Sequence, residues 1–172
     1  MPARAGISHL LEQGYRRIGF LGARMDPRVQ RRFEGYQAAM NDAALFDPRR
    51  VVTTATPSSV TLGGTLLADL LAKAPDVEAV FCGNDDIALG ALFECQRRRM
   101  SVPEQMAIVG FNDLEFMSCA VPTLTSVRTN RYEMGRDAAV MLIEAVEGRR
   151  PAQPVVDLGF SVMKRQSSVR RT

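Results

Sequence analysis

The sequence predicts an α/β fold in which a parallel β-sheet is sandwiched between helices. Short apolar runs alternate with amphipathic segments of about 10–15 residues, which is the pattern of strand–helix–strand units. The apolar runs are nearly continuous, as expected when both faces of a strand are buried. With 172 residues, 46% hydrophobic and 24% charged, the chain has the size and composition of one globular domain or one lobe of a larger protein.

In the first half of the chain, apolar residues three or four positions apart indicate helices, and short apolar or β-branched runs indicate strands. Ile7, Leu10 and Leu11 have helical spacing, and Gly14 is suited to ending that helix. We expect strands at 17–22 and 51–56 and helices at 29–43 and 59–73. The pair Gly63-Gly64 lies inside the second of these helices and indicates close packing rather than a phosphate-binding loop.

The second half of the chain repeats this alternation. The run EAVFCG stops at a glycine and is followed by polar residues and then by IALGALFECQRRR, so a strand at 78–83 precedes a helix at 87–99. The three arginines that end this helix suit its C-terminal end, because cations interact favourably with the helix dipole there. We expect further strands at 106–112, 124–129 and 155–165 and a helix at 132–148.

The composition argues against several classes of protein. His9 is the only histidine, so a histidine-rich metal centre cannot form, and a Ser-His-Asp hydrolase would have to use His9. The three cysteines form no CxxC pair, so we expect reduced thiols, two of them buried. The net charge of +3 comes from scattered arginines, and this chain alone is not expected to bind nucleic acid. No apolar run approaches the ~20 residues of a membrane helix and no signal-peptide pattern is present, so we expect a cytoplasmic protein without a membrane partner.

Polar residues gather where the predicted strands end. In a parallel sheet with right-handed crossovers, the carboxyl ends of the strands lie at one edge, where ligands bind. The corner after Cys82 reads GNDD, the corner after Phe111 reads NDLE, and the corner after Leu21 carries several arginines. Arginine donates to carboxylates and paired hydroxyls, and asparagine both donates and accepts. Such a set of side chains suits a small hydroxylated or anionic molecule.

Two interpretations of Asn84, Asp85 and Asp86 are open: helix capping alone, or capping combined with ligand binding. Asn and Asp are preferred N-cap residues, because their side chains accept hydrogen bonds from the first free amides of a helix. One cap needs one residue, so we expect Asp85 or Asp86 to cap the helix or to hold the shape of the corner, while Asn84 turns toward a ligand. Arg31 and Arg32 point about 100° apart on a helix, so only one of them can face the site.

An enzyme would use the carboxylates of these corners for glycoside or phosphate-ester hydrolysis; they belong to Asp85, Asp86, Asp113 and Glu115. Against this interpretation, the sequence contains no glycine-rich phosphate loop and no pattern of an activated nucleophile. We therefore expect a binding protein rather than an enzyme, without a metal or a cofactor.

Four segments resemble one protein family: GYRRIGFLGA, RRFEGYQAAM, VFCGNDDIALGALFECQRRRMSVPEQMAIVGFND and PTLTSVRTNRYEMGRDAAVMLIEAVEG. In this order and at these separations, they are similar to the C-terminal, effector-binding part of the LacI/GalR family of bacterial transcription regulators. The resemblance covers about residues 5–165. Within the family the chain is most similar to gluconate-utilisation repressors, through FLGAR, FCGNDD, GALFECQR and VVDLGF.

The resemblance implies a C-terminal lobe of the type I periplasmic-binding-protein clamshell, which closes on a small sugar or sugar acid, here a gluconate-like one. Matched position by position, it implies that six residues bind the effector: Arg32, Ser58, Asn84, Asn112, Thr129 and Arg131. Many members have Asp at the position of Asn112, and one negative charge fewer suits an acidic sugar. Some members have an aromatic ring at the position of Arg131, so apolar stacking is not expected there.

The resemblance also divides the chain. Residues 1–123 correspond to the effector-binding lobe, 124–150 to a strand and a helix that cross toward the N-terminal lobe, and 151–172 to a returning strand and a basic tail. The helix–turn–helix of the family and the first part of its N-terminal lobe are missing from this sequence, so operator DNA is expected to be bound only through that missing domain. The apolar residues of 132–148 are then expected to pack on a second copy, as in a homodimer, or to fold back.

We therefore expect the effector-sensing part of a LacI-type repressor. In the intact protein, effector binding would change lobe closure and dimer geometry, and with them operator affinity. One alternative is a free-standing, secreted sugar-binding module of the periplasmic-binding-protein superfamily, against which the missing signal peptide and the unpaired cysteines count. The other is the carboxylate-based hydrolase, which a chromogenic glycoside or phosphate ester would reveal.

Overall fold

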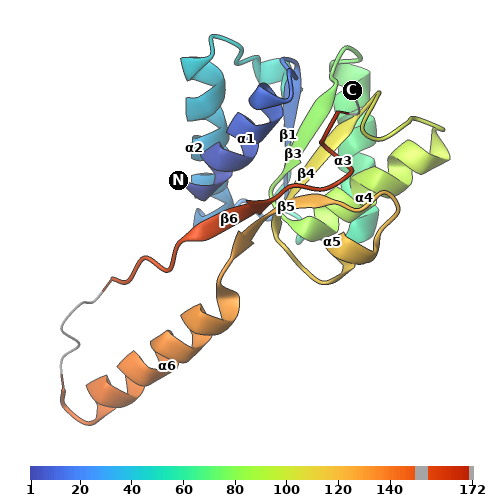
Figure 1. The fold of residues 1–172 in the computed structure, drawn as a ribbon. Helices are drawn as coiled ribbons and strands as arrows, with labels where there is room; N and C mark the ends of the chain where they lie inside the picture. The colour runs from blue at the N-terminus through green and yellow to red at the C-terminus, as the bar shows by residue number, and fades with distance from the viewer. Residues whose placement is uncertain (150–154, 171–172) are drawn as a thin grey trace.

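A computed structural model of the chain describes residues 1–149 and 155–170. Its centre is one sheet built from β1 (Ile18–Gly22), β2 (Val51–Thr53), β3 (Ala79–Cys82), β4 (Ala107–Asn112), β5 (Thr125–Thr129) and β6 (Phe160–Met163). The strand order is β2-β1-β3-β4-β5-β6 (Figure 1). The first five strands run parallel, as predicted, whereas β6 runs antiparallel to β5.

Helices cover both faces of the sheet, which confirms the predicted α/β sandwich (Figure 1). One face carries α1 (Pro2–Glu12) and α2 (Pro27–Asp42), and the other carries α3 (Val60–Lys73), α4 (Asp85–Arg97) and the short α5 (Phe116–Cys119). The sequence did not predict α5 or the 3₁₀ helix η1 (Pro48–Arg50). None of the described helices is long and apolar enough to cross a membrane.

Two hydrophobic cores lie on opposite faces of the sheet, because successive residues of a strand point to opposite sides. Ile18 and Phe20 pack toward α1 and α2, where the Phe20 ring lies 5.4 Å from that of Tyr36. Leu21 and Cys82 pack toward α3 and α4. Cys95 is also buried and Cys119 is exposed, so two of the three thiols are buried, as predicted.

Glycines allow α3 and α4 to pack closely, as the pair Gly63-Gly64 suggested. A Cβ atom on Gly63 would collide with the backbone of Ile87, and one on Gly90 would collide with the carbonyl oxygen of Val60. This close packing fixes the position of α4 along α3, because the two helices cannot slide past each other without a clash.

After β6 the chain returns to the body of the fold, where Ser167 and Ser168 are buried. Ile108 N–H donates to the carbonyl oxygen of Ser167 at 2.8 Å, so this segment continues the bonding of β4. The Ser168 hydroxyl lies 2.8 Å from Nε2 of the buried His9 and 2.6 Å from the Thr125 hydroxyl. Polar bonds thus join Ser167 and Ser168 to β4, α1 and β5.

The last helix, α6 (Arg131–Val146), projects away from the sheet (Figure 1). None of its residues is buried, and Tyr132, Leu142 and Val146 are 79%, 66% and 82% exposed. The predicted helix at 132–148 is therefore confirmed, while the strand predicted at 155–165 is limited to β6. The predicted boundary at 150/151 and the end of the basic tail at 171–172 lie outside the described residues.

Candidate functional site

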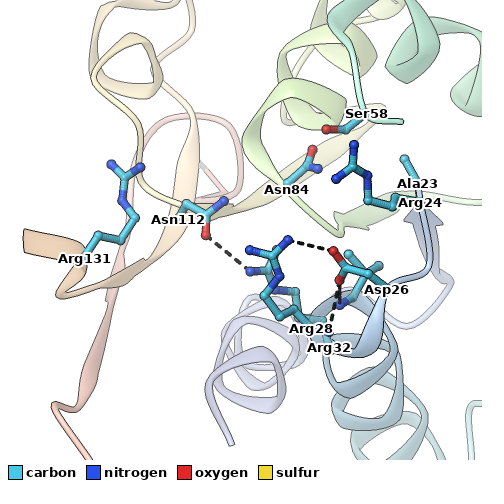
Figure 2. Close-up of a pocket in the computed structure, with 10 residues that line it drawn as sticks. Ala23, Arg24, Asp26, Arg28, Arg32, Ser58, Asn84, Asn112 and Arg131 are labelled. Carbon is cyan, nitrogen blue, oxygen red and sulfur yellow. Dashed lines mark hydrogen bonds and ion pairs between the residues drawn. The ribbon is translucent and has the colours of Figure 1, made fainter. Parts of the chain in front are cut away.

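A cavity of about 380 Å³ lies at the carboxyl edge of the sheet, where the crossover direction reverses (Figure 2). The chain passes from β1 to its neighbour β2 through α2 on one face, and then to β3 through α3 on the other face. The carboxyl ends of β1 and β3 therefore border a crevice, which is where ligands bind in open α/β sheets. The cavity is lined by Ala23, Arg24, Asp26, Arg28, Val29, Arg32, Ser58, Asn84, Asn112 and Arg131.

Five of the six residues predicted to bind a ligand line this cavity together: Arg32, Ser58, Asn84, Asn112 and Arg131. The sixth, Thr129, lines an adjoining, largely apolar cavity of about 580 Å³ that shares some of the same residues. The arginine-rich corner after β1 had indicated that arginines gather here, but not which ones. Arg24, Asp26 and Arg28 were not predicted individually.

Arg32 is anchored by three neighbours. Its Nη1 donates to the carbonyl oxygen of Gly83 at 2.5 Å, and its Nη2 donates to Oδ1 of Asn112 at 3.4 Å. Its Cζ lies 3.9 Å from the centre of the Phe111 ring. Burial and then repulsion from Arg28 lower the pKa of Arg32 to about 10, so the side chain stays cationic at neutral pH. Arg31 is exposed and does not line this cavity, so only one of the two adjacent arginines faces it, as the helical spacing predicted.

Asn84, and not an aspartate, caps α4, so that expectation was wrong. Asn84 is the last residue with extended backbone angles before the helix, and its Oδ1 accepts from Ile87 N–H at 3.1 Å. An aspartate one position later already lies within the helix and cannot take this role. Because Oδ1 of Asn84 is occupied, its Nδ2 is the group left to face the cavity as a donor.

Asp85 holds the shape of the neighbouring corner, which was the other role considered for it. Its buried carboxylate accepts from Leu114 N–H and from the Ser126 hydroxyl, both at 2.7 Å. Ser126 Oγ in turn accepts from Asp113 N–H at 3.1 Å. These bonds fix a turn in which Asn112 and Asp113 have φ of 117° and 57°, values that residues other than glycine rarely adopt. Burial raises the pKa of Asp85 above its ordinary value.

The carboxylates considered for hydrolysis are engaged elsewhere or lie outside the cavity. Asp113 pairs with Arg165 at 2.6 Å and with Arg128 at 2.7 Å. Burial raises the pKa of Asp113, but these hydrogen bonds outweigh it and leave the pKa below the ordinary value. Glu115 is exposed at the start of α5. Among the described residues that line the cavity, Asp26 alone carries a carboxylate.

Asp26 belongs to the local structure of α2. Its side chain caps the helix by accepting from the backbone N–H groups of Arg28 and Val29. The Arg28 guanidinium also donates a hydrogen bond to the Asp26 carboxylate in an ion pair of 2.7 Å. This hydrogen bond is the main reason that the pKa of Asp26 is lowered to about 2. The lining therefore carries four arginines against one carboxylate that is already paired, a net of three positive charges.

A mostly parallel sheet with a donor-rich cavity at its switch point is typical of proteins that bind small polar molecules. Residues 7–168 match the periplasmic binding protein-like domain. The chain is 45% identical over 164 residues to the HTH-type transcriptional regulator GntR of Pseudomonas aeruginosa, with 95% of this chain and 48% of that protein covered. It is 42% identical over 161 residues to the HTH-type transcriptional regulator IdnR of Escherichia coli strain K12, covering 91% and 47%.

Solved structures agree with these relatives. The transcription regulator GntR from Chromobacterium violaceum superposes with a TM-score of 0.93 at 44% identity, over 96% of this chain and 61% of that one. The chain belongs to the periplasmic-binding-protein-like domain family, in the LacI-type group of bacterial transcription regulators. It spans about half the length of the curated relatives it matches.

Proposed function

We propose that this chain is the effector-binding lobe of a LacI-type repressor and that its effector is a sugar acid of the gluconate type. The observation that carries this proposal is the charge of the cavity: four lining arginines face one carboxylate, and that carboxylate is already paired with Arg28. A gluconate-type molecule has a carboxylate that arginine binds well and a chain of hydroxyls that asparagine, serine and arginine can read.

The contacts of Arg32 and Asn112 support hydroxyl recognition. Their mutual bond is long at 3.4 Å, so a ligand hydroxyl placed between them can replace it with two shorter bonds. Arg32 retains its firm bond to Gly83, which keeps the guanidinium in place when the ligand is absent. The site is therefore organised before the ligand arrives, which lowers the entropic cost of binding.

In the full-length regulator, the effector signal passes to operator DNA through parts of the protein outside this chain. We propose the division expected from the sequence: residues 1–123 form the lobe, 124–150 cross to the rest of the protein, and 151–172 return. The exposed apolar residues of α6 then dock on the N-terminal lobe or on a second copy in a homodimer. If this 172-residue chain sediments as a monomer with α6 cleaved readily by protease, homodimerisation through α6 is refuted for the chain on its own.

The effector proposal is tested by thermal unfolding of this chain with gluconate, glucose, glucitol and phosphorylated sugars. At 100 times its dissociation constant, a ligand adds about 2.7 kcal/mol to the free energy of unfolding. For a chain of this size, that corresponds to a rise in Tm of roughly 5–10 °C. We expect this rise with gluconate and a smaller one with the neutral sugars.

Adjacent arginines provide the matched control. Arg32→Ala should abolish the rise in Tm with gluconate, because it removes the anchored guanidinium. Arg31→Ala removes the same charge from the neighbouring position on α2 and should leave the rise unchanged. Equal shifts with neutral sugars and gluconate would refute the sugar-acid proposal. If none of these ligands raises the Tm, the proposed function of this chain as an effector-binding lobe is refuted.

A further inference from the structure

Arg24 and Arg131 are the two arginines of the cavity whose guanidinium groups have no hydrogen-bond or ion-pair partner among the described residues, and they lie at opposite ends of it (Figure 2). Arg24 lies two residues after the end of β1, and its side chain is exposed at the cavity beside Ser58 and Asn84 (Figure 2). Arg28 is paired with Asp26, and Arg32 is held by Gly83. Within the parts of the chain that are described, the guanidinium of Arg24 makes neither a hydrogen bond nor an ion pair.

The backbone holds Arg24 firmly even though its side chain is unbound. Arg24 and Met25 have φ of 62° and 48°, two consecutive left-handed residues without a glycine. The Arg24 N–H donates to Thr56 O at 2.8 Å, and the Met25 N–H donates to Ala23 O at 2.8 Å. Gln30 Nε2 also donates to Met25 O at 2.9 Å. Strained backbone that neighbouring bonds enforce in this way is typical of ligand-binding sites.

The neighbours of Arg24 add donors and no negative charge. Asn84 uses its Oδ1 to cap α4, so it presents an N–H group to the cavity. Ser58 contributes a hydroxyl. The first acidic residue of α4, Asp85, is turned to Leu114 N–H and the Ser126 hydroxyl and does not line the cavity. A carboxylate has about four lone-pair positions for such donors.

The opposite end of the cavity has a different character. Arg131 lies across the cavity on the far side of Asn112 (Figure 2). It begins α6, which projects from the body of the fold, so packing among the described residues does not fix its position. The end at Arg24 is built from the fixed corners after β1, β2 and β3, the strands that border the switch point.

We infer that Arg24 is the residue that selects a carboxylate: its guanidinium, together with the Ser58 hydroxyl and Asn84 Nδ2, binds the acid group of the effector. Arg32 and Asn112 then contact the hydroxyls. This inference rests on the proposed function, because it assigns the two ends of a sugar acid within the same cavity. It predicts that Arg24 contributes to affinity for the acid and hardly at all to affinity for the neutral analogue.

The test is calorimetric titration of this chain with gluconate and with gluconamide, its uncharged amide of nearly the same shape. We expect the wild-type chain to bind gluconate at least about 10-fold more tightly, since hydrogen bonds between charged groups are the stronger ones. Arg24→Gln should weaken gluconate binding by about 10- to 100-fold and change gluconamide binding by less than about 3-fold. Arg24→Lys should recover part of the loss, because it restores charge but not the planar fork.

Arg99→Gln is the matched control for charge and backbone. Arg99 is exposed, lies outside the cavity and has a left-handed φ of 58°, so this variant loses the same charge from the same backbone conformation. Unchanged gluconate affinity in Arg24→Gln, equal weakening for both ligands, or equal binding of both by the wild type would each overturn the inference. Failure of the wild-type chain to bind either ligand would instead refute the proposed function.

Discussion

Replacing Asp85 with alanine removes the carboxylate that joins the start of α4 to the turn after β4 and to β5. Two buried donors, Leu114 N–H and the Ser126 hydroxyl, then lose partners at 2.7 Å. Each unpaired buried group costs about 1–3 kcal/mol. The raised pKa of Asp85 means that the ionised carboxylate is itself costly to bury, and its removal offsets part of that loss. We therefore expect a net loss of about 2–3 kcal/mol in the free energy of unfolding.

Urea unfolding at neutral pH, followed by circular dichroism, measures this loss as a lower midpoint with an unchanged slope. Asp85→Asn should lose about half as much, because one amide oxygen can still accept one of the two hydrogen bonds. Asp86→Ala is the control at the adjacent position in the first turn of α4, and it should cost less than about 1 kcal/mol through the helix dipole.

The pH dependence gives a second measure of the same carboxylate. Because burial raises the pKa of Asp85, the folded chain binds its proton more tightly than the unfolded chain does. The stability contributed by Asp85 is therefore full below the ordinary carboxyl pKa and declines as pH rises through the folded-state pKa. The advantage of the wild type over Asp85→Asn should shrink with rising pH. An advantage that grows with pH, or a cost of Asp85→Ala below about 0.5 kcal/mol, would refute the reasoning.

Three other changes test separate features. Asn84→Ala should lower the free energy of unfolding by about 0.5–2 kcal/mol through loss of the cap, measured in urea, and should also weaken gluconate binding; an unchanged stability would contradict the cap. Gly90→Ala should lower stability by about 1–3 kcal/mol, seen as a drop in Tm, because the new Cβ collides with Val60 O; a neutral effect would mean that α3 and α4 separate freely. Burial, and then the charge of Lys164, lower the pKa of His9 from 6.5, so the folded chain binds this proton less tightly than the unfolded chain and stability should fall as pH drops below that value. In His9→Gln, the free energy of unfolding should depend less on pH between about pH 5 and 7 than in the wild type. An unchanged pH dependence would mean that other groups cause it.

Much of the fold could be predicted because burial on both faces leaves a strong mark on the sequence. The apolar runs of β1, β3 and β4 are central strands, and their predicted ends differ from the observed ones by at most one residue. The strands at the two edges were predicted too long. β2 ends at Thr53 and β6 is confined to Phe160–Met163, because an edge strand pairs on one side only and its ends have no neighbour to extend them. The antiparallel direction of β6 has no local signal.

The site could be predicted in position but not in its internal bonding. Strand ends and polar corners placed Asn84 and Asn112 at one edge of the sheet, whereas Arg32 was chosen by the family resemblance; the three line one cavity. Which residue caps α4 depends on a one-residue difference in where the helix begins. The partners of Asp85 lie 29 and 41 positions away along the chain, beyond the reach of any spacing argument. The left-handed backbone of Arg24 is likewise enforced by Thr56, a residue of another segment.

The segment that carries α6, residues 130–159, leaves and re-enters the fold through β5 and β6, which are antiparallel neighbours with Thr129 paired to Phe160. Two such strands can be joined by a turn of only two residues. In topological terms, the lobe ends in a β-hairpin whose tip has been expanded into residues 130–159. The free energy of closing a loop varies only slowly with its length, so the size of this insertion has little effect on the sheet. A change in the length of residues 130–159 therefore need not shift the register of β5 against β6.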